Sequence, residues 1–213
     1  MTWTIGIPDE EFHQRRPLQG LITKAEVRVI ALSKLRIRPD SVVWDIGAGS
    51  GSVSIEAALL APKGHVYAIE RGQEDLDNVL KNIEKFGTSN VTTVLSTAPN
   101  GLEEFSDPDA VFIGGTAGHM AAILEVVAQR LRPDGRVVID AATMENLHEG
   151  VTQLKALGFA TEVILVSISR SKDIVNLTRF EALNPVFVIA GWRDQTVDPI
   201  NITKNPLDMA PPP

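Results

Sequence analysis

Short apolar runs alternate along the chain with longer segments in which apolar residues recur every three or four positions. The runs have the length of buried strands, and the longer segments have the period of helices with one buried face. The predicted strands cover residues 42–46, 65–69, 91–95, 110–113 and 136–139. The predicted helices cover residues 23–35, 53–60, 74–86, 121–131 and 144–157. This alternation predicts a parallel sheet covered by helices on both faces.

The pattern changes near the end of the chain. Residues 161–169 and 186–190 are predicted to be strands, and no helix-length pattern lies between them. A parallel pair would need a longer crossover, so these two strands are predicted to be antiparallel. The expected fold is an α/β, Rossmann-like, doubly wound sheet of five strand–helix units, closed by an antiparallel strand pair.

We predict a single domain over residues 1–192. Its first 40 residues form an N-terminal extension and a helix, at whose start Thr23 and Glu26 are predicted to form a capping box. Residues 193–213 are rich in proline and are expected to form a mobile tail.

Composition narrows the possible functions. Hydrophobic residues make up 44% of the 213 positions, and no apolar run is long enough to suggest a membrane span. The chain has no cysteine, and its four histidines are scattered, so we expect no metal site. The net charge of −7 argues against a nucleic-acid partner. We therefore expect a cytoplasmic protein that binds neither a membrane nor nucleic acid.

A glycine-rich loop after the first predicted strand is the clearest functional signal. It consists of Gly47, Ala48, Gly49, Ser50 and Gly51. Glycine lets a ligand lie against the backbone, and the helix that follows points free amides toward that ligand. The dinucleotide fingerprint G-x-G-x-x-G needs a glycine at position 52, where this chain has Ser52. The spacing favours S-adenosylmethionine (SAM) over NAD.

Residues at other strand ends extend this predicted cofactor site. Glu70 ends the second strand and is expected to accept hydrogen bonds from the ribose hydroxyls, although an NAD site would use the same acid. Asp45 ends the first strand and is assigned to the positively charged methionine portion, acting through the loop or a water. Ala98 follows the third strand and is expected to reach the adenine. Asp109 begins the fourth strand and is interpreted as structural.

Several blocks of the sequence resemble one family, the decarboxylating precorrin methyltransferases of cobalamin biosynthesis. The glycine loop is common to all class I methyltransferases. The opening Gly-Ile-Pro-Asp-Glu run, the Thr-Lys-x-Glu-Val-Arg helix start and the Phe-Ile-Gly-Gly turn are more specific together. The blocks that carry the resemblance are residues 6–12, 22–28, 44–53, 67–71, 98–99, 110–115 and 184–186.

The resemblance implies a class I methyltransferase fold and SAM as the cofactor. It implies methylation of carbon 15 of a precorrin or cobalt-precorrin, with decarboxylation of the acetate on carbon 12. It also implies a homotetramer, and cofactor contacts at positions matching Thr23, residues 47–51, Glu70 and Ala98. The same module forms half of longer enzymes that methylate twice, so a separate enzyme is expected to perform the other methylation.

The tetrapyrrole implied by the resemblance is a polycarboxylate, which a protein of net charge −7 repels at long range. Guanidinium groups bind carboxylates in bidentate fashion, so a local basic cluster is expected. The candidate substrate-binding residues are Arg15, Arg16, Arg170, Lys172 and Arg179. A solvated helix face is the alternative interpretation of the N-terminal arginines. His119 is considered as a catalytic proton donor or acceptor, and also as a helix cap.

Three other functions stay open on the sequence. An NAD-dependent dehydrogenase would use a similar loop and acid, although Ser52 and the closing strand pair count against it. A methyltransferase for another small molecule or a protein acceptor would share the fold. A SAM-binding protein without catalysis is the third. Methylation of nucleic-acid amino groups is disfavoured, because residues 113–116 lack the Asn/Asp-Pro-Pro-aromatic motif.

Overall fold

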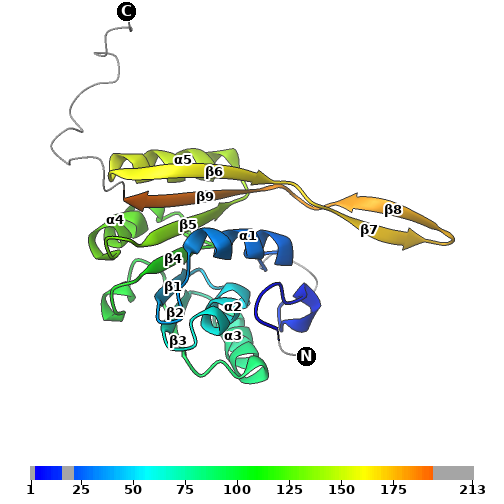
Figure 1. The fold of residues 1–213 in the computed structure, drawn as a ribbon, viewed down its shortest axis with the longest axis horizontal. Helices are drawn as coiled ribbons and strands as arrows, with labels where there is room; N and C mark the ends of the chain where they lie inside the picture. Colours follow the sequence, from blue (N-terminus) through cyan, green and yellow to red (C-terminus); the bar gives the residue numbers. More distant parts are fainter. Residues whose placement is uncertain (1–2, 16–21, 194–213) are drawn as a thin grey trace, which may run out of the picture.

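A seven-stranded sheet forms the centre of the molecule (Figure 1). The computed structural model describes residues 3–15 and 22–193. The strand order is β3-β2-β1-β4-β5-β9-β6, in which β1 to β5 are parallel and β9 is antiparallel to both β5 and β6. The strands are β1 (Val42–Ile46), β2 (His65–Glu70), β3 (Val91–Leu95), β4 (Ala110–Ile113), β5 (Arg136–Ala141), β6 (Phe159–Val166) and β9 (Val186–Arg193). The predicted doubly wound sheet with a closing antiparallel pair is confirmed.

Helices cover both faces of this sheet. One face packs against α1 (Ala25–Leu35), α2 (Ser52–Leu60) and α3 (Gln73–Phe86). The other packs against α4 (Met120–Arg130) and α5 (Met144–Ala156). Among the described residues, no helix has the length and apolar character needed to cross a bilayer.

The prediction of five strand–helix units was wrong at the third strand. After β3 the chain forms only a short 3-10 helix, η2 (Leu102–Glu104), before entering β4. This short element still contributes to the core, because Leu102 and Phe105 are buried beside Trp44. Trp44 and Phe105 make an edge-to-face contact with ring centroids 5.6 Å apart.

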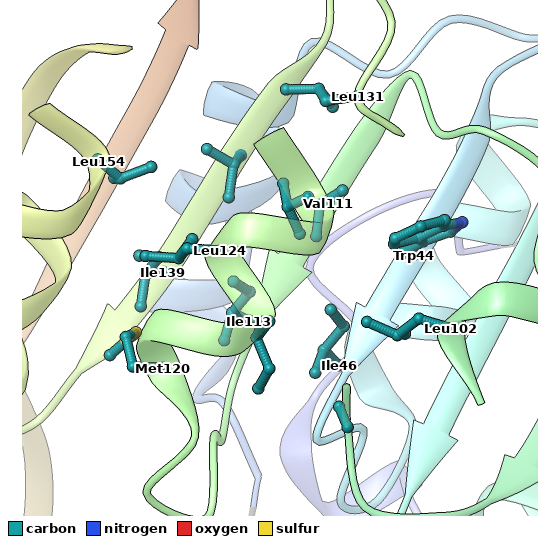
Figure 2. Packing of buried hydrophobic residues seen from close by; sticks show 14 of the residues in the cluster. Trp44, Ile46, Leu102, Val111, Ile113, Met120, Leu124, Leu131, Ile139 and Leu154 are labelled. Atoms are coloured by element: carbon teal, nitrogen blue, oxygen red, sulfur yellow. The ribbon is translucent and has the colours of Figure 1, made fainter. Parts of the chain in front are cut away.

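The larger hydrophobic core lies between the sheet and α4 (Figure 2). Ile46, Ile113 and Ile139 point to this face from three adjacent parallel strands, and Leu124 packs against them from α4. Burying a side chain of this size stabilises the fold by about 1.5–3 kcal/mol. The central strands are apolar on both faces because helices cover both, and their carboxyl ends are therefore held in a fixed arrangement.

The start of the chain packs across the outer face of α2. Ile7, Phe12 and Ile22 are buried there against Ile55, so α2 is buried on both sides. This explains why the helix has little polar surface despite lying outside the sheet. The short 3-10 helix η1 (Asp9–Glu11) belongs to the same N-terminal segment.

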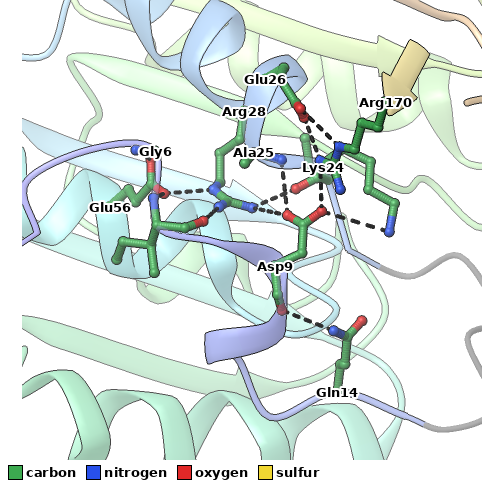
Figure 3. A network of polar contacts seen from close by, with 11 residues as sticks. Gly6, Asp9, Gln14, Lys24, Ala25, Glu26, Arg28, Glu56 and Arg170 are labelled. Carbon is green, nitrogen blue, oxygen red and sulfur yellow. Dashed lines mark hydrogen bonds and ion pairs between the residues drawn. The ribbon is translucent and has the colours of Figure 1, made fainter. Parts of the chain in front are cut away.

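A buried polar network holds the N-terminal segment in place (Figure 3). Arg28 is fully buried in α1 and donates through Nε to Glu56 Oε1 of α2, at 2.8 Å. Arg28 also donates to the carbonyls of Ile7 and Thr23. Glu56, equally buried, accepts from the backbone amides of Gly6 and Ile7 at 3.0 and 2.8 Å. The ion pair between Arg28 and Glu56 therefore joins α1 to α2, and it also binds backbone groups before and after residues 16–21.

The predicted capping box at Thr23 and Glu26 was wrong. The helix begins at Ala25, and Lys24, whose side chain has no acceptor, occupies the N-cap position. The carboxylate of Asp9 replaces the cap, because its Oδ1 accepts from the Ala25 amide at 2.9 Å. Glu26 instead binds Arg170, which holds the pKa of Glu26 below its usual value.

An antiparallel hairpin extends beyond the edge of the molecule (Figure 1). Its strands β7 (Ser169–Ile174) and β8 (Leu177–Ala182) pair only with each other and form a separate two-stranded sheet. The sequence analysis missed this hairpin and extended the preceding strand to residue 169, whereas β6 ends at Val166. The turn contains no glycine. Val175 adopts the left-handed backbone conformation there, with φ 55°.

The buried network generates a stability prediction. Replacing Arg28 by methionine (Arg28→Met) leaves the Glu56 carboxylate buried without its charge partner, which costs about 3–5 kcal/mol. The matched control is Lys34→Met on the same helix, where the ion pair with Glu162 is partly exposed and the loss should be at most about 1 kcal/mol. Urea unfolding of both variants measures the difference. Equal losses would show that the buried pair does not hold the N-terminal segment.

Candidate functional site

A cavity of about 710 Å³ opens at the carboxyl ends of the parallel strands. This edge of the sheet, next to the reversal of strand order between β1 and β4, is where ligands bind in doubly wound folds. The volume lies within the range of small-molecule sites, about 300–1,000 Å³. Its walls include Arg15, residues 22–24, Val27, 47–49, 70–72, 96–98, Phe112, 114–117, Asp140, 182–184 and Val186.

The glycine loop forms one end of the cavity. Gly47 has φ 72°, and a Cβ added there would lie 2.6 Å from the backbone oxygen of Gly115, so only glycine fits between the two loops. Gly51 also has a positive φ, and a Cβ there would meet Val79 of α3 at 2.9 Å. The amides of Gly47 and Ala48 are held by the carbonyl of Ile69, at 3.0 and 3.1 Å. The loop is therefore fixed by packing and exposes its backbone to the cavity.

Glu70 lies beside this loop at the end of β2 and also lines the cavity. Its Oε2 accepts from the amide of Gly49 at 2.9 Å, and its Oε1 accepts from the amides of Arg71 and Gly72 at 2.8 and 2.9 Å. The side chain is 8% exposed. The position of the carboxylate is thus set by three backbone donors, and it is available to a ligand that brings hydroxyl donors to the cavity.

The predicted cofactor residues do not all reach the cavity. Gly47, Ala48, Gly49, Glu70 and Ala98 line it, and so does Thr23 from the segment before α1. Asp45, Ser50 and Gly51 are not among the described residues that line the cavity. Gly51 is the N-cap of α2, and the carbonyl of Ser50 accepts from Asn82 at 2.8 Å.

Asp45 is buried beneath the loop rather than exposed to the cavity. Its Oδ2 accepts a hydrogen bond from the Ser54 hydroxyl of α2, and its Oδ1 has no hydrogen-bond partner among the described residues. Burial raises the pKa of Asp45 to about 7 against the opposing hydrogen bond from Ser54, and the charge of Glu70 adds to the rise. Asp45 can therefore act on a ligand only through the loop or α2.

The predicted basic cluster is only partly brought to the cavity. Arg15 lines it and forms an ion pair with Asp75 of α3, with a second carboxylate, that of Glu74, at 3.6 Å. Arg16 lies outside the described residues. Lys24 also lines the cavity, 3.9 Å from the Asp9 carboxylate, and the sequence analysis did not select it as a site residue.

The basic residues of the hairpin are bound by carboxylates of the same chain. Arg170 pairs with Glu26 and, at 3.1 Å, with Asp9, so it fixes the base of the hairpin to the N-terminal segment. Lys172 and Arg179 both pair with Glu181, at 2.9 and 3.7 Å. None of the three basic side chains is among the described residues that line the cavity.

His119 lies at the N-cap position of α4 and is exposed. The neighbouring residues Thr116 and Ala117 line the cavity, whereas His119 does not appear among its described walls. The geometry therefore gives this histidine no contact with the cavity.

Asp140 is the functional candidate that the sequence analysis missed. It lies near the end of β5, lines the cavity, and presents a buried Oδ1 without a hydrogen-bond partner among the described residues. Burial and the charge of Asp45 raise the pKa of Asp140 to about 7, against the opposing effect of the Thr23 side chain. The predicted strand ended at Ile139, and an acid directly after a buried strand, as at Glu70, was the available signal.

The described residues offer no metal centre, because their His, Asp and Glu side chains form no group of three placed to hold an ion. The arrangement can instead hold an elongated organic ligand, with its hydroxyl groups at Glu70 and its other end beneath α1. Phe112, Asp140 and Asn184 line the same cavity.

Comparison with known proteins gives a consistent set of relatives. The sequence profile of the precorrin methyltransferase domain matches residues 17–193. A probable cobalt-precorrin-6B C(15)-methyltransferase (decarboxylating) from Pyrobaculum calidifontis is 40% identical over 197 residues, covering 90% of this chain and 100% of that protein.

Two solved structures are similar over most of the chain. The precorrin-6y C5,15-methyltransferase from Geobacter metallireducens has 43% identity and a TM-score of 0.86, covering 90% of this chain and 100% of that chain. A precorrin 8W decarboxylase from Methanobacterium thermoautotrophicum has 31% identity and a TM-score of 0.81, covering 86% and 98%.

Proposed function

The chain belongs to the precorrin methyltransferase family, and on this basis we propose that it methylates carbon 15 of a precorrin or cobalt-precorrin and decarboxylates the acetate on carbon 12. The observation that supports this most directly is that the glycine loop, Glu70, Asp140 and Asn184 all line one cavity of about 710 Å³. One end suits a nucleoside, and the other leaves room for an acceptor.

SAM is the proposed cofactor, and the residues present fit it. The loop between Gly47 and Gly49 admits backbone contact that a Cβ at Gly47 would prevent. The Glu70 carboxylate can accept from both hydroxyls of an unphosphorylated ribose and would repel a 2′-phosphate. Ala98 also lines the cavity, and its backbone is proposed to contact the adenine. Bound here, SAM supplies an electrophilic methyl group to the acceptor.

Asp45 and Thr23 are proposed to position the methionine portion of the cofactor. Asp45 fixes the start of α2 through Ser54, and so sets the direction of the free amides at that helix end. Thr23 lines the opposite wall, where its carbonyl is held by Arg28 at 2.6 Å. The buried network therefore determines the position of this wall relative to the loop.

Carboxylates of the acceptor are proposed to meet the cationic groups at the cavity walls. Arg15 and Lys24 line it, and both have carboxylate neighbours that limit their net positive charge. Arg170 is bound to Glu26 and Asp9, so we assign it first to holding the hairpin base beside Lys24. Arg16, Lys172 and Arg179 remain proposed contacts for the periphery of the tetrapyrrole.

Positioning is proposed to supply most of the rate acceleration for methyl transfer, since an acceptor carbon must be aligned with the methyl group. The rigid loop and the wall formed by α1 hold the two reactants in one cavity. The conjugated ring supplies the electrons, so the chain needs no nucleophile of its own.

Mass spectrometry of a precorrin-6B-type tetrapyrrole, after incubation with the protein and SAM, tests the proposal. The expected product has gained one methyl group and lost carbon dioxide, because both reactions are assigned to this chain. The control reaction contains NAD in place of SAM and should leave the tetrapyrrole unchanged. An unchanged mass with SAM would contradict the proposed substrate, and methylation without loss of carbon dioxide would contradict the decarboxylase half.

The β7–β8 hairpin supports the proposed homotetramer. Val175, Leu177 and Phe180 are 94%, 77% and 75% exposed, although all three are large and apolar. An isolated two-stranded hairpin is marginally stable in water, so large exposed apolar side chains along it favour a partner that covers them. We assign the hairpin to contacts between copies of the chain.

The double variant Leu177→Ser and Phe180→Ser is expected to convert the tetramer into smaller species, because it removes apolar area from the proposed interface. Light scattering after size exclusion measures the mass. Leu80→Ser is the matched control, since Leu80 is also exposed, at 48%, but lies on α3. A tetramer that persists in the hairpin variant, or a monomeric parent protein, would contradict this assignment.

A further inference from the structure

The Asp140 carboxyl differs from the other acids at the carboxyl edge of the sheet. Glu70 accepts from three backbone amides. Asp45 also has a buried Oδ1 without a partner among the described residues, but Asp45 is not among those that line the cavity. The Oδ1 of Asp140 is buried and accepts no hydrogen bond within the part of the chain that the structure describes. A buried carboxyl oxygen without a partner is costly, so its presence in a cavity wall needs an explanation other than stability.

The position of Asp140 places it on the acceptor side of the cavity. In β5 its side chain shares a face with Val138, which packs in the core beneath α1, and that face also carries Asp45 and Phe112 from β1 and β4. Two strand spacings separate β5 from β1, about 10 Å. Asp140 therefore lies two strands away from the strand that leads into the glycine loop, and its side chain interacts with Thr23.

The surroundings of Asp140 favour the protonated carboxyl. The acidic group of Asp45 on β1 adds to the rise in the pKa of Asp140, whereas the hydrogen bond with the Thr23 side chain opposes it. Lys24 lines the same cavity from that segment, while β4 contributes Phe112 and β9 pairs Val188 with Asp140, both uncharged. Burial is the largest influence and raises the pKa of Asp140 to about 7. A neutral acid at this place can donate a hydrogen bond to an acetate carboxylate without adding a second negative charge.

We propose that Asp140 is the catalytic acid that protonates the carbon from which carbon dioxide has left, an inference that rests on the proposed function. The bond between the acetate methylene and its carboxylate breaks, carbon dioxide leaves, and the electron pair stays on the methylene carbon, delocalised into the ring. The proton on the Asp140 oxygen passes to that carbon and forms a C–H bond. The Asp140 carboxylate then takes a proton from solvent through the cavity mouth.

The proposal is tested with Asp140→Asn, Asp140→Glu and a control, Asp77→Asn, whose side chain accepts from Gln73 on the exposed face of α3. Mass spectrometry over time separates the methylated product that keeps its carboxylate from the decarboxylated one. Positioned general acids contribute about 10²–10⁴-fold, so Asp140→Asn should slow formation of the decarboxylated product at least about 100-fold. Methyl transfer should slow by less than about tenfold, and Asp140→Glu should recover part of the loss.

A wild-type protein that leaves the tetrapyrrole unchanged overturns the proposed function as a whole. With wild-type activity present, the role of Asp140 is overturned if Asp140→Asn decarboxylates at the wild-type rate, or if it loses methyl transfer and decarboxylation equally. The second result would mean that the carboxyl only shapes the cavity.

The free energy of unfolding, measured as a function of pH, tests whether Asp140 holds a proton and needs no substrate. In the unfolded chain Asp140 loses its proton near its ordinary pKa of 3.8, whereas in the folded protein it keeps the proton to about pH 7. Between these values ionisation favours unfolding, so the folded protein loses stability as pH rises through this window. Asp140→Asn lacks this loss, and its stability relative to wild type should increase from about pH 4 to pH 7. A difference that is flat across the window overturns the claim that Asp140 holds a proton.

Discussion

The ion pair between Arg28 and Glu56 holds the segment that carries Thr23 and Lys24 to the cavity, although neither side chain of the pair is among the described residues that line it. Both side chains are fully buried, and each also binds backbone of the N-terminal segment. Breaking one partner would leave a buried charge, so the arrangement is stable only as a complete set. The segment before α1 that carries Thr23 and Lys24 is thereby fixed opposite the glycine loop.

The same network reaches the hairpin through Asp9. One oxygen of Asp9 caps α1 at Ala25, and the other accepts from Arg170 at the start of β7. The base of the proposed association surface is therefore connected to the segment before α1 through Asp9, and to α1 through Glu26. A copy that binds the hairpin would act on an element that also orients Lys24, which is 3.9 Å from Asp9.

The features that could be predicted from the sequence are those that depend on residues close together along the chain. The first strand, the glycine loop and α2 follow from a continuous stretch of about twenty residues, and Glu70 and Ala98 were selected because each directly follows or ends a strand. The family resemblance assigned Thr23 to the cofactor, and Thr23 does line the cavity. Its predicted cap failed because the actual cap, Asp9, comes from fourteen residues earlier, where no local pattern identifies it.

The remaining differences have similar causes. The hairpin strands alternate charged residues and bury no face in the core, so they lack the periodic apolar signal of the other strands. Asp140 was missed because the predicted strand stopped one residue short of it, and its lack of a partner is visible only in three dimensions. The basic residues of the hairpin were expected at the substrate, but they pair with Glu26 of α1 and with Glu181 of β8, contacts that depend on the three-dimensional arrangement.

The proposed function divides one cavity into a cofactor end at Glu70 and an acceptor end at Asp140. A crystal structure of the protein with S-adenosylhomocysteine tests it most directly. We expect both ribose hydroxyls to lie within hydrogen-bond distance of the Glu70 carboxylate. We expect the sulfur atom to face the part of the cavity that is lined by Thr23, Phe112 and Asp140. A ribose bound away from Glu70, or a sulfur atom facing away from Thr23, Phe112 and Asp140, would contradict the proposed division of the cavity.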